Sequence, residues 1–212
     1  MGSLLRRSLL ALLLFVAVYA PAFAWVAWLR PSVEVTIPLI IAVSTAVAAI
    51  CIGLLASRTK GIAEFGLARS PLSYIIAATL AGVIIGVAFA YIAALHPAHS
   101  PLDLSRLRPW MIMVYFVIAA PIQEELIFRG LLQSMIARGV PSASSFWATH
   151  CPVIFTAALF GIIHLDSGIV VAIEAVLLGL MAGELRRMSS SLIPAVLFHA
   201  LLNAASALWP SA

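Results

Sequence analysis

Residues 109–137 read PWMIMVYFVIAAPIQEELIFRGLLQSMIA, an apolar stretch long enough to cross a bilayer that carries charge at its centre. Glu124, Glu125 and Arg129 lie within six positions of one another. On insertion scales, one charged residue at the centre of a spanning helix costs about 2.5 to 3.5 kcal/mol. A chain that keeps three of them at that depth is expected to use them, so this stretch predicts both a membrane fold and the place of its chemistry.

The composition extends the membrane prediction to the whole chain. Of the 212 residues, 64% are hydrophobic and 9% are charged, whereas an ordinary soluble domain carries about 25% charged residues. A soluble domain of this length leaves about 30% of its chain surface in water, where so much apolar surface could not be covered. The formal net charge is +4, but the basic residues form no long run, so we expect no nucleic-acid partner.

Seven apolar segments, each about as long as a membrane-spanning helix, follow one another along the chain. They cover residues 8–29, 35–56, 72–95, 109–137, 146–164, 168–185 and 191–209. The first contains Ala22-Phe23-Ala24, which is typical of a signal-peptidase site, but the apolar run continues beyond it and predicts a retained helix. The sequence therefore predicts one all-α domain over residues 1–212, a polytopic bundle of about seven transmembrane helices that encloses an intramembrane polar cavity.

The basic residues near the segment ends predict the orientation of this multi-pass membrane protein. With the amino terminus inside, the inner side holds eight of them and the outer side three. The inner set is Arg6, Arg7, Arg58, Lys60, Arg69, Arg138, Arg186 and Arg187, and the outer set is Arg30, Arg106 and Arg108. The positive-inside pattern favours this orientation, and the short loops favour a prokaryotic plasma membrane.

Three pairs of residues four positions apart place functional groups on single helix faces. The pairs are Glu125 with Arg129, Phe160 with His164, and His199 with Asn203. Pro121 removes a backbone hydrogen bond just before Glu124, and irregular backbone at this depth survives only inside protein or beside a watery cavity. We therefore expect a small aqueous pocket beside Glu124.

The residue types in these pairs predict peptide hydrolysis. Two adjacent carboxylates need a cation in a medium of low dielectric constant, and Arg129 can supply it to Glu125 as structural support. Glu124 is then left as a general base that activates water, with His164 orienting that water or sharing its proton. His199 and Asn203 offer the donors that an oxyanion needs. Each pair alone also fits a purely structural role between helices, but the coincidence of all three favours a site.

The same residues resemble three motifs of the CAAX-protease and bacteriocin-processing family of intramembrane endopeptidases. Residues 120–130, APIQEELIFRG, resemble its EExxxR motif, residues 160–164 its FxxxH motif, and residues 199–203 its HxxxN motif, in the expected order. Phe65-Gly66-Leu67 resembles a further motif of the same family, but more weakly. The resemblance covers residues 109–203, taken as the catalytic core. It implies that Glu124 and His164 activate water and that His199 and Asn203 stabilise the oxyanion, without an obligatory metal.

Several alternatives remain open. Glu124, His164 and His199 could instead bind zinc, although no HExxH spacing is present. The chain could be a non-catalytic immunity or binding protein of the same fold, or a transporter that relays protons through Glu124 and Glu174, for which two similar halves are expected and none is visible. Glu174 itself fits either a site-facing partner or a hydrogen bond to a neighbouring helix.

The partners predicted for a protease are membrane lipid and a membrane-associated peptide or protein. A prenylated CaaX tail, a leader peptide and a carboxyl-terminal sorting tail all fit the resemblance.

The depth of His164 in the membrane is a geometric difficulty for this site. If each segment is a straight helix, Glu124 and His199 lie near mid-membrane, whereas His164 lies at the end of its segment. The three residues converge only if segment 146–164 starts later, segment 168–185 is short, or the loop after His164 dips inward.

Overall fold

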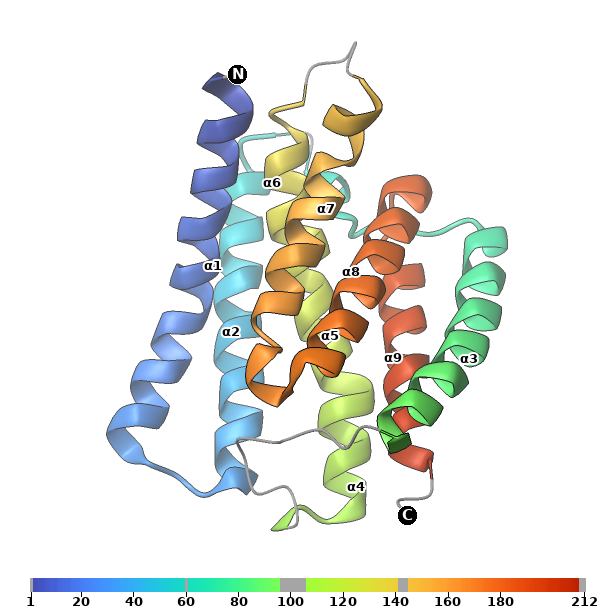
Figure 1. Cartoon of the computed structure of the whole chain (residues 1–212). Coiled ribbons are helices and arrows are strands. Elements are labelled where there is room, and N and C mark those ends of the chain that lie inside the picture. Colours follow the sequence, from blue (N-terminus) through green and yellow to red (C-terminus); the bar gives the residue numbers. More distant parts are fainter. Residues whose placement is uncertain (1, 60, 96–105, 141–144, 210–212) are drawn as a thin grey trace.

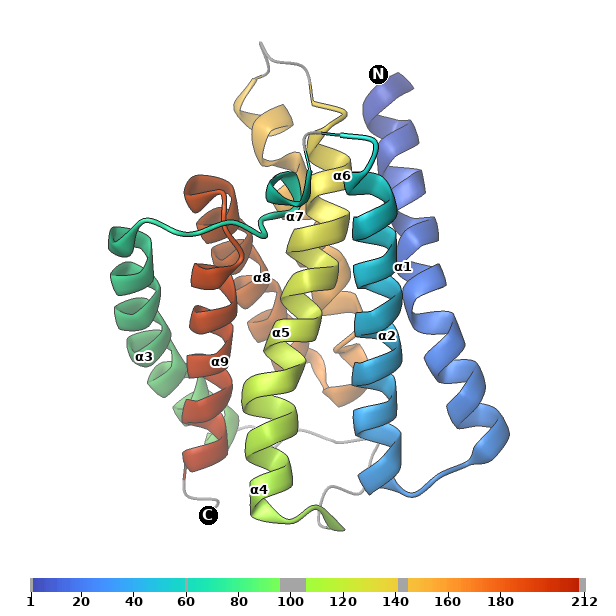
Figure 2. The ribbon, with the colours of Figure 1, turned by 180° about the vertical axis from the view of Figure 1, so that it is seen from behind.

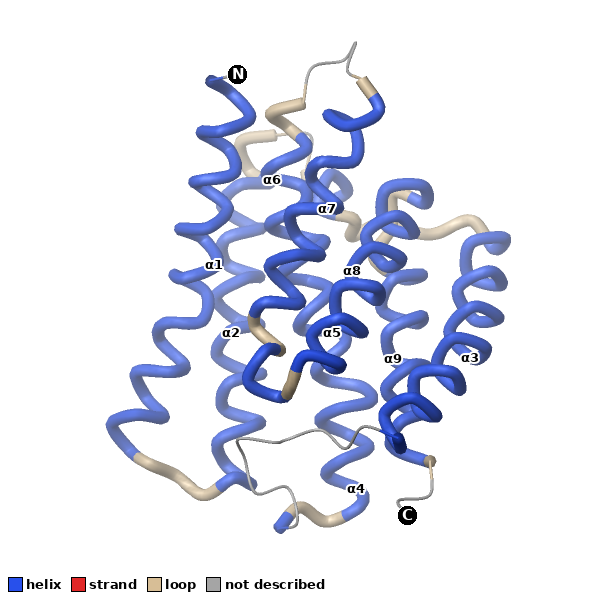
Figure 3. Tube along the Cα trace, viewed as in Figure 1, coloured by secondary structure: helices blue, strands red, loops and turns tan. Residues whose placement is uncertain are grey.

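A computed structural model of the chain describes residues 2–59, 61–95, 106–140 and 145–209. The longer helices are α1 (Gly2–Leu29), α2 (Val33–Ala56), α3 (Leu72–Leu95), α7 (Phe146–Ile162), α8 (Ile169–Ser189) and α9 (Ile193–Leu208). Between α3 and α7 lie α4 (Pro109–Ile112), η3 (Met113–Ala119), α5 (Ala120–Glu125), η4 (Leu126–Gln133) and α6 (Ser134–Ala137). Two short turns of 3₁₀ helix, η1 (Ile62–Phe65) and η5 (Leu165–Ser167), complete the set. The described residues contain no strand (Figure 3), and the predicted all-α class is confirmed.

The five elements from α4 to α6 form one continuous rod, Pro109–Ala137, which we call the central rod. Figures 1 and 2 show α1 and α2 on one side of this rod and α9 on the other, with α3 on the outside of α9. Helix α1 begins and α9 ends at opposite ends of the bundle, as seven passes require (Figure 1). The amino-terminal end also carries the carboxyl ends of α2, α6 and α8.

Four helices of the described chain are long and apolar enough to cross a membrane: Leu4–Leu29, Val33–Ala56, Leu72–Leu95 and Pro109–Ala137. Their outward faces carry large apolar side chains such as Leu13, Trp28 and Ile84, which are 67%, 80% and 69% exposed. Apolar side chains on such surfaces are stable in lipid and not in water. The chain is therefore an integral membrane protein built as a helical bundle.

The central rod is enclosed by its neighbours, unlike the helices that face lipid. From Ile127 to Ile136, every side chain of the rod is buried. Its contacts come from α1 and α2 on one side and from α7, α8 and α9 on the other. Charge on this rod is consequently held inside protein, where partners can be supplied.

The bounds of segments 72–95 and 109–137 were predicted to the residue, whereas α1 begins six residues earlier than predicted and α8 ends four residues later. The sequence placed Arg186 and Arg187 in a turn, whereas α8 continues through both to Ser189. It ends there because Ser190 adopts a left-handed conformation, with φ of 56°. Arginines in the last turn of a helix are stabilised by its dipole, which the hydropathy pattern does not register.

The turn between α7 and α8 removes the geometric difficulty over His164. Helix α7 ends at Ile162, two residues before His164, and η5 then reverses the chain. Figure 1 shows this turn short of the level at which α2 and α4 begin. Of the three ways in which the residues could converge, the structure shows the last: the loop after His164 stays inside the bundle. The His164 imidazole therefore lies within the depth of the bundle.

Small residues allow α7 and α8 to pack closely enough for this hairpin. A Cβ on Gly161 would lie 2.3 Å from Val176 Cγ2, and one on Gly179 would lie 2.8 Å from Ala157 Cα. A Cβ on Gly183 would lie 2.7 Å from Val153 Cγ1. Helices in membranes associate through such small-residue contacts because lipid offers no hydrophobic driving force between them.

Candidate active site

The central rod departs from regular α-helix on both sides of its acidic pair. Met113–Ala119 and Leu126–Gln133 are π-helical, with α-helix between them at Ala120–Glu125. Such widened turns are rare and occur often at functional sites. Pro121 lies in the α-helical part and leaves one carbonyl without its backbone donor, as described below for Asn203.

A buried chain of charged side chains starts from Arg129 in η4. Arg129 Nη1 donates to Glu125 Oε1 at 2.9 Å, and both side chains are 0% exposed. His199 from α9, which is 3% exposed, donates from Nδ1 to the same Oε1 at 2.9 Å. A carboxylate only accepts hydrogen bonds, so this contact fixes Nδ1 as a protonated nitrogen and turns Nε2 away from Glu125.

Glu124 faces the other side of the same imidazole. His199 Nε2 lies 3.6 Å from Glu124 Oε2, and the Glu124 side chain is 19% exposed, against 0% for Glu125. His199 therefore lies between two carboxylates of unequal environment. Glu125 is enclosed and held by Arg129, whereas Glu124 can be reached by a small molecule. A general base must be accessible to water, whereas a supporting carboxylate can be enclosed, and Glu124 and Glu125 differ in this way.

The ring of Phe160 connects the two imidazoles. Its centroid lies 4.6 Å from that of His164 and 5.9 Å from that of His199, the latter at an interplanar angle of 82°. The Arg129 guanidinium lies 5.0 Å from the same ring centroid, a cation–π distance. His164 Nδ1 donates to the Phe160 carbonyl at 2.7 Å, which leaves its Nε2 free. His164 makes no ion pair with Glu124 within the described chain.

Asn203 from α9 makes a hydrogen bond that the central rod lacks. Its Nδ2 donates to the Phe116 carbonyl at 2.7 Å. In η3 the Ala120 N–H bonds to the Tyr115 carbonyl, five residues back, and the next donor in that series would belong to Pro121, which has none. Asn203 supplies the missing hydrogen bond. An amide nitrogen has two hydrogens, so one donor remains.

Comparisons with known proteins identify a family that the carboxyl-terminal half of the chain resembles. The family described as type II CAAX prenyl endopeptidase Rce1-like matches residues 106–205. We call these matched residues the Rce1-like segment. No curated protein and no solved structure matches the chain. The family predicted from the three motifs is confirmed, and it is a family of peptidases.

The Rce1-like segment contains the whole central rod and nearly all of the carboxyl-terminal helices, α7, α8 and α9. All four predicted catalytic residues, Glu124, His164, His199 and Asn203, therefore lie inside it. Helices α1, α2 and α3 lie outside the matched residues. The catalytic roles of the four residues stay predictions.

One polar contact near the site was not predicted from the sequence. Gln123, which is 4% exposed, donates from Nε2 to Tyr19 Oη and to Ser44 Oγ, each at 3.0 Å. These bonds tie the Rce1-like segment to α1 and α2 one residue before Glu124. A glutamine beside two glutamates in an apolar stretch was the available signal, but its partners are 104 and 79 residues away.

Other acidic residues lie apart from this cluster. Glu184 bonds to Arg187 at 2.7 Å and to His150 at 2.6 Å. Glu174 in α8 has a buried Oε1 with no partner among the described residues. The polar loop at 96–105, with His96 and His99, lies outside the described residues.

The zinc alternative requires three side chains that can reach one metal ion. The described part of the chain contains no group of three or more His, Cys, Asp or Glu side chains placed to hold one metal ion. Glu124, His164 and His199 are not such a group. The Nδ1 bonds of His164 to a carbonyl and of His199 to Glu125 are of the kind that metal-ligating histidines also make, so these bonds do not exclude zinc, and the metal-free mechanism stays a prediction.

Proposed function

We propose that this protein is an intramembrane endopeptidase that hydrolyses a peptide bond of a membrane-associated peptide or protein, with Glu124 activating the water. The observation that carries the proposal is the placement of His199 between Glu124, at 3.6 Å, and Glu125, at 2.9 Å. The match of residues 106–205 to a peptidase family supports it. Neither a proton relay nor a passive binding surface requires an accessible carboxylate beside an imidazole oriented by a buried ion pair.

In the proposed reaction, the Glu124 carboxylate takes a proton from water as the water oxygen attacks the carbonyl carbon of the scissile amide. The carbonyl π electrons move onto oxygen and give a tetrahedral oxyanion. When that intermediate collapses, the carbon–nitrogen bond breaks and the leaving amine takes the proton back from Glu124. A carboxyl and an amine are formed, and Glu124 ends as it began.

His199 and Asn203 are the proposed donors to the oxyanion. With both ring nitrogens protonated, His199 is complemented by the carboxylates on either side and donates from Nε2. Asn203 contributes the amide hydrogen that does not bond to Phe116. The bonds to Glu125 and to the Phe116 carbonyl fix both side chains before substrate arrives, so little reorganisation is needed during the reaction.

His164 is the proposed second contact for the water. Its free Nε2 and its position on the Phe160 ring, which His199 also touches, support this role. The substrate classes that fit are a prenylated CaaX tail, a leader peptide and a carboxyl-terminal sorting tail. All three present a peptide bond beside lipid, where a membrane-embedded site can reach it.

The test uses the full chain in proteoliposomes and three fluorogenic peptides, one from each of these classes. Wild type is expected to hydrolyse at least one peptide, and Glu124→Gln is expected to lower kcat about 10²- to 10⁴-fold, the usual contribution of a general base. Glu184→Gln, which removes a carboxylate at the end of the bundle, is the matched control and should retain activity. Equal rates for Glu124→Gln and wild type, or no hydrolysis of any peptide, would contradict the proposal.

Exhaustive chelation of the active preparation addresses the metal question separately. The proposed mechanism uses only side chains and water, so kcat is expected to be unchanged after metal removal. A loss of activity that zinc restores would replace it with a metal mechanism.

A further inference from the structure

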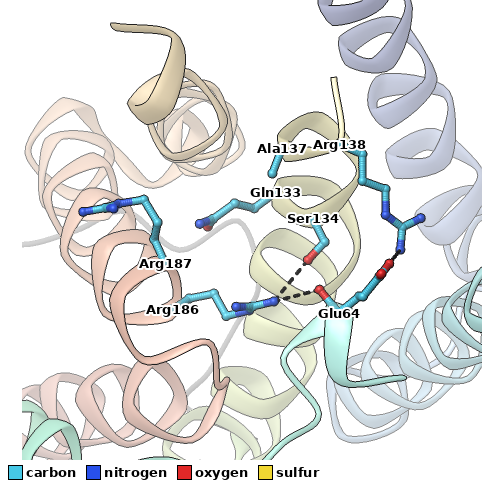
Figure 4. A pocket seen from close by; sticks show the side chains of 7 residues that line it. All are labelled: Glu64, Gln133, Ser134, Ala137, Arg138, Arg186 and Arg187. Atoms are coloured by element: carbon cyan, nitrogen blue, oxygen red, sulfur yellow. Dashed lines mark hydrogen bonds and ion pairs between the residues drawn. The ribbon is translucent and has the colours of Figure 1, made fainter. Parts of the chain in front are cut away.

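A pocket of about 380 Å³ opens at the amino-terminal end of the bundle, away from the candidate active site. Figure 4 shows it between the end of the central rod, the last turn of α8 and the η1 segment. Its lining includes Glu64, Gln133, Ser134, Arg138, Arg186 and Arg187. Three arginines face one glutamate, so the formal charge of the lining favours an anion.

Two of the three arginines already have carboxylate partners. Arg138 Nη2 bonds to Glu64 Oε2 at 2.9 Å, and Arg187 Nε bonds to Glu184 Oε2 at 2.7 Å. Both arginines are partly exposed, so water also screens their charge. Neither one requires a further anion.

Arg186 differs from both of them because it is buried and pairs with no carboxylate among the described residues. It is 9% exposed, and its hydrogen bonds to described residues run from Nη2 alone, to the Glu64 carbonyl at 2.9 Å and to Ser134 Oγ at 3.4 Å (Figure 4). Its Nε is buried without a partner. Neutral oxygens satisfy part of the guanidinium but do not balance its charge, and an uncompensated buried cation is strongly destabilising.

The surrounding backbone holds this guanidinium in place. Gly66 has a φ of 83°, and a Cβ there would lie 2.4 Å from Arg186 Nε, so only glycine leaves room for the side chain. The Gly66 carbonyl accepts from Leu192 N at 2.9 Å, and Ser191 Oγ donates to the Ala68 carbonyl at 2.7 Å. The η1 segment is thereby fixed to the start of α9, and the cation is preorganised.

We infer that this pocket binds a phosphate group, and that Arg186 is its principal contact. A planar guanidinium matches phosphate oxygens in geometry and charge. The pocket lies at the end of the bundle that carries most of the basic residues, where the headgroups of the inner leaflet are predicted to lie. That leaflet is rich in anionic lipid, so an anionic phospholipid headgroup is the source that fits best. The inference does not rest on the proposed function, since it concerns neither the peptide nor the acidic pair.

The test measures lipid binding to the detergent-solubilised full chain by native mass spectrometry. Phosphatidylglycerol is expected to bind wild type at least fivefold more tightly than phosphatidylcholine, because choline would bring a further cation to a pocket that already holds three. Arg186→Gln is expected to weaken phosphatidylglycerol binding at least tenfold. Arg58→Gln is the matched control, since it removes one exposed charge at the same end of the bundle and should leave binding unchanged.

A second variant keeps the test valid if Arg186→Gln fails to fold. Ala137 lines the pocket and is exposed, so Ala137→Leu narrows the pocket and leaves the bonds of Arg186 intact. It should also weaken phosphatidylglycerol binding. Inorganic phosphate is the other probe, and stabilisation of wild type by 10 mM phosphate that is lost in both pocket variants, without any lipid preference, would identify free phosphate as the source. Binding of both probes that neither variant alters, or no binding of either probe to wild type, would overturn the inference.

Discussion

The carbonyl oxygen of Phe116 connects a proline in the first motif to an asparagine in the third. Pro121 cannot donate to it, and Asn203 does so at 2.7 Å. Asn203→Ala should therefore leave this carbonyl without its partner and lower the free energy of unfolding by about 1 to 3 kcal/mol. Thermal unfolding in detergent micelles measures the change.

The double variant with Pro121→Ala separates the structural role of Asn203 from a catalytic one. Alanine restores a backbone N–H at position 121, so the stability lost through Asn203→Ala should be smaller in that background. The loss of kcat should persist, because the restored N–H lies in the rod and not at the oxyanion. Recovery of both stability and activity would mean that Asn203 acts only on the rod.

The ion pair between Glu125 and Arg129 gives a second prediction. Both side chains are fully buried, so Arg129→Met should leave an uncompensated carboxylate and destabilise the fold by about 3 to 5 kcal/mol. Glu125→Gln added to Arg129→Met removes that charge while keeping an acceptor for His199. The double variant should be more stable than Arg129→Met in the same unfolding assay. Additive losses would contradict the pairing.

At this scale the sequence predicted the polar side chains of the site but not what surrounds them. Glu125 and Arg129 are four positions apart, and helix geometry alone brings residues at that spacing together. The bond from Gln123 to Tyr19 depends on how α1 is rotated against the rod, and α1 is apolar on every face. Periodicity carries no information there, so this contact could only come from the structure.

The packing of α7 on α8 depends on Gly179, and that dependence can be measured. A Cβ at this position would lie 2.8 Å from the backbone of Ala157 and 3.3 Å from Arg129 Nη2. Gly179→Ala should therefore push the helices apart, destabilise the protein by about 1 to 3 kcal/mol and lower kcat by displacing Arg129. Gly53→Ala in α2 is the control, since nothing lies within 4 Å of its Cβ. Equal effects of the two substitutions would refute this account.

Helix positions were largely readable from hydropathy, whereas hydrogen-bond patterns were not. Apolar length fixes where α3 and the central rod begin and end. The π-helical turns at Met113–Ala119 and Leu126–Gln133 have the same composition as regular helix, so no sequence pattern marks them. The depth of His164 likewise depended on whether a loop stays inside the bundle, which residue counting leaves open.

The candidate active site and the pocket with three arginines lie at different depths along the membrane normal. Glu124 lies near the middle of the central rod, 13 residues before Ala137. The pocket lined by Arg138, Arg186 and Arg187 lies at the carboxyl-terminal end of the same rod, at the end of the bundle where α1 begins. The site is therefore deep in the bundle while the pocket is at the level expected for headgroups, so binding at one should not block the other.

Orientation in the membrane decides which leaflet the arginine pocket meets. Eight basic residues on the amino-terminal side against three on the other predict that this side faces inward. With Cys51 and Cys151 first replaced by alanine, single cysteines at Ser57→Cys and Ser32→Cys, both at exposed positions, report the two ends. A membrane-impermeant maleimide applied to intact cells should label Ser32→Cys and reach Ser57→Cys only after lysis. The reverse pattern would place the pocket in the outer leaflet, where its phosphate would have to come from a different pool of lipid.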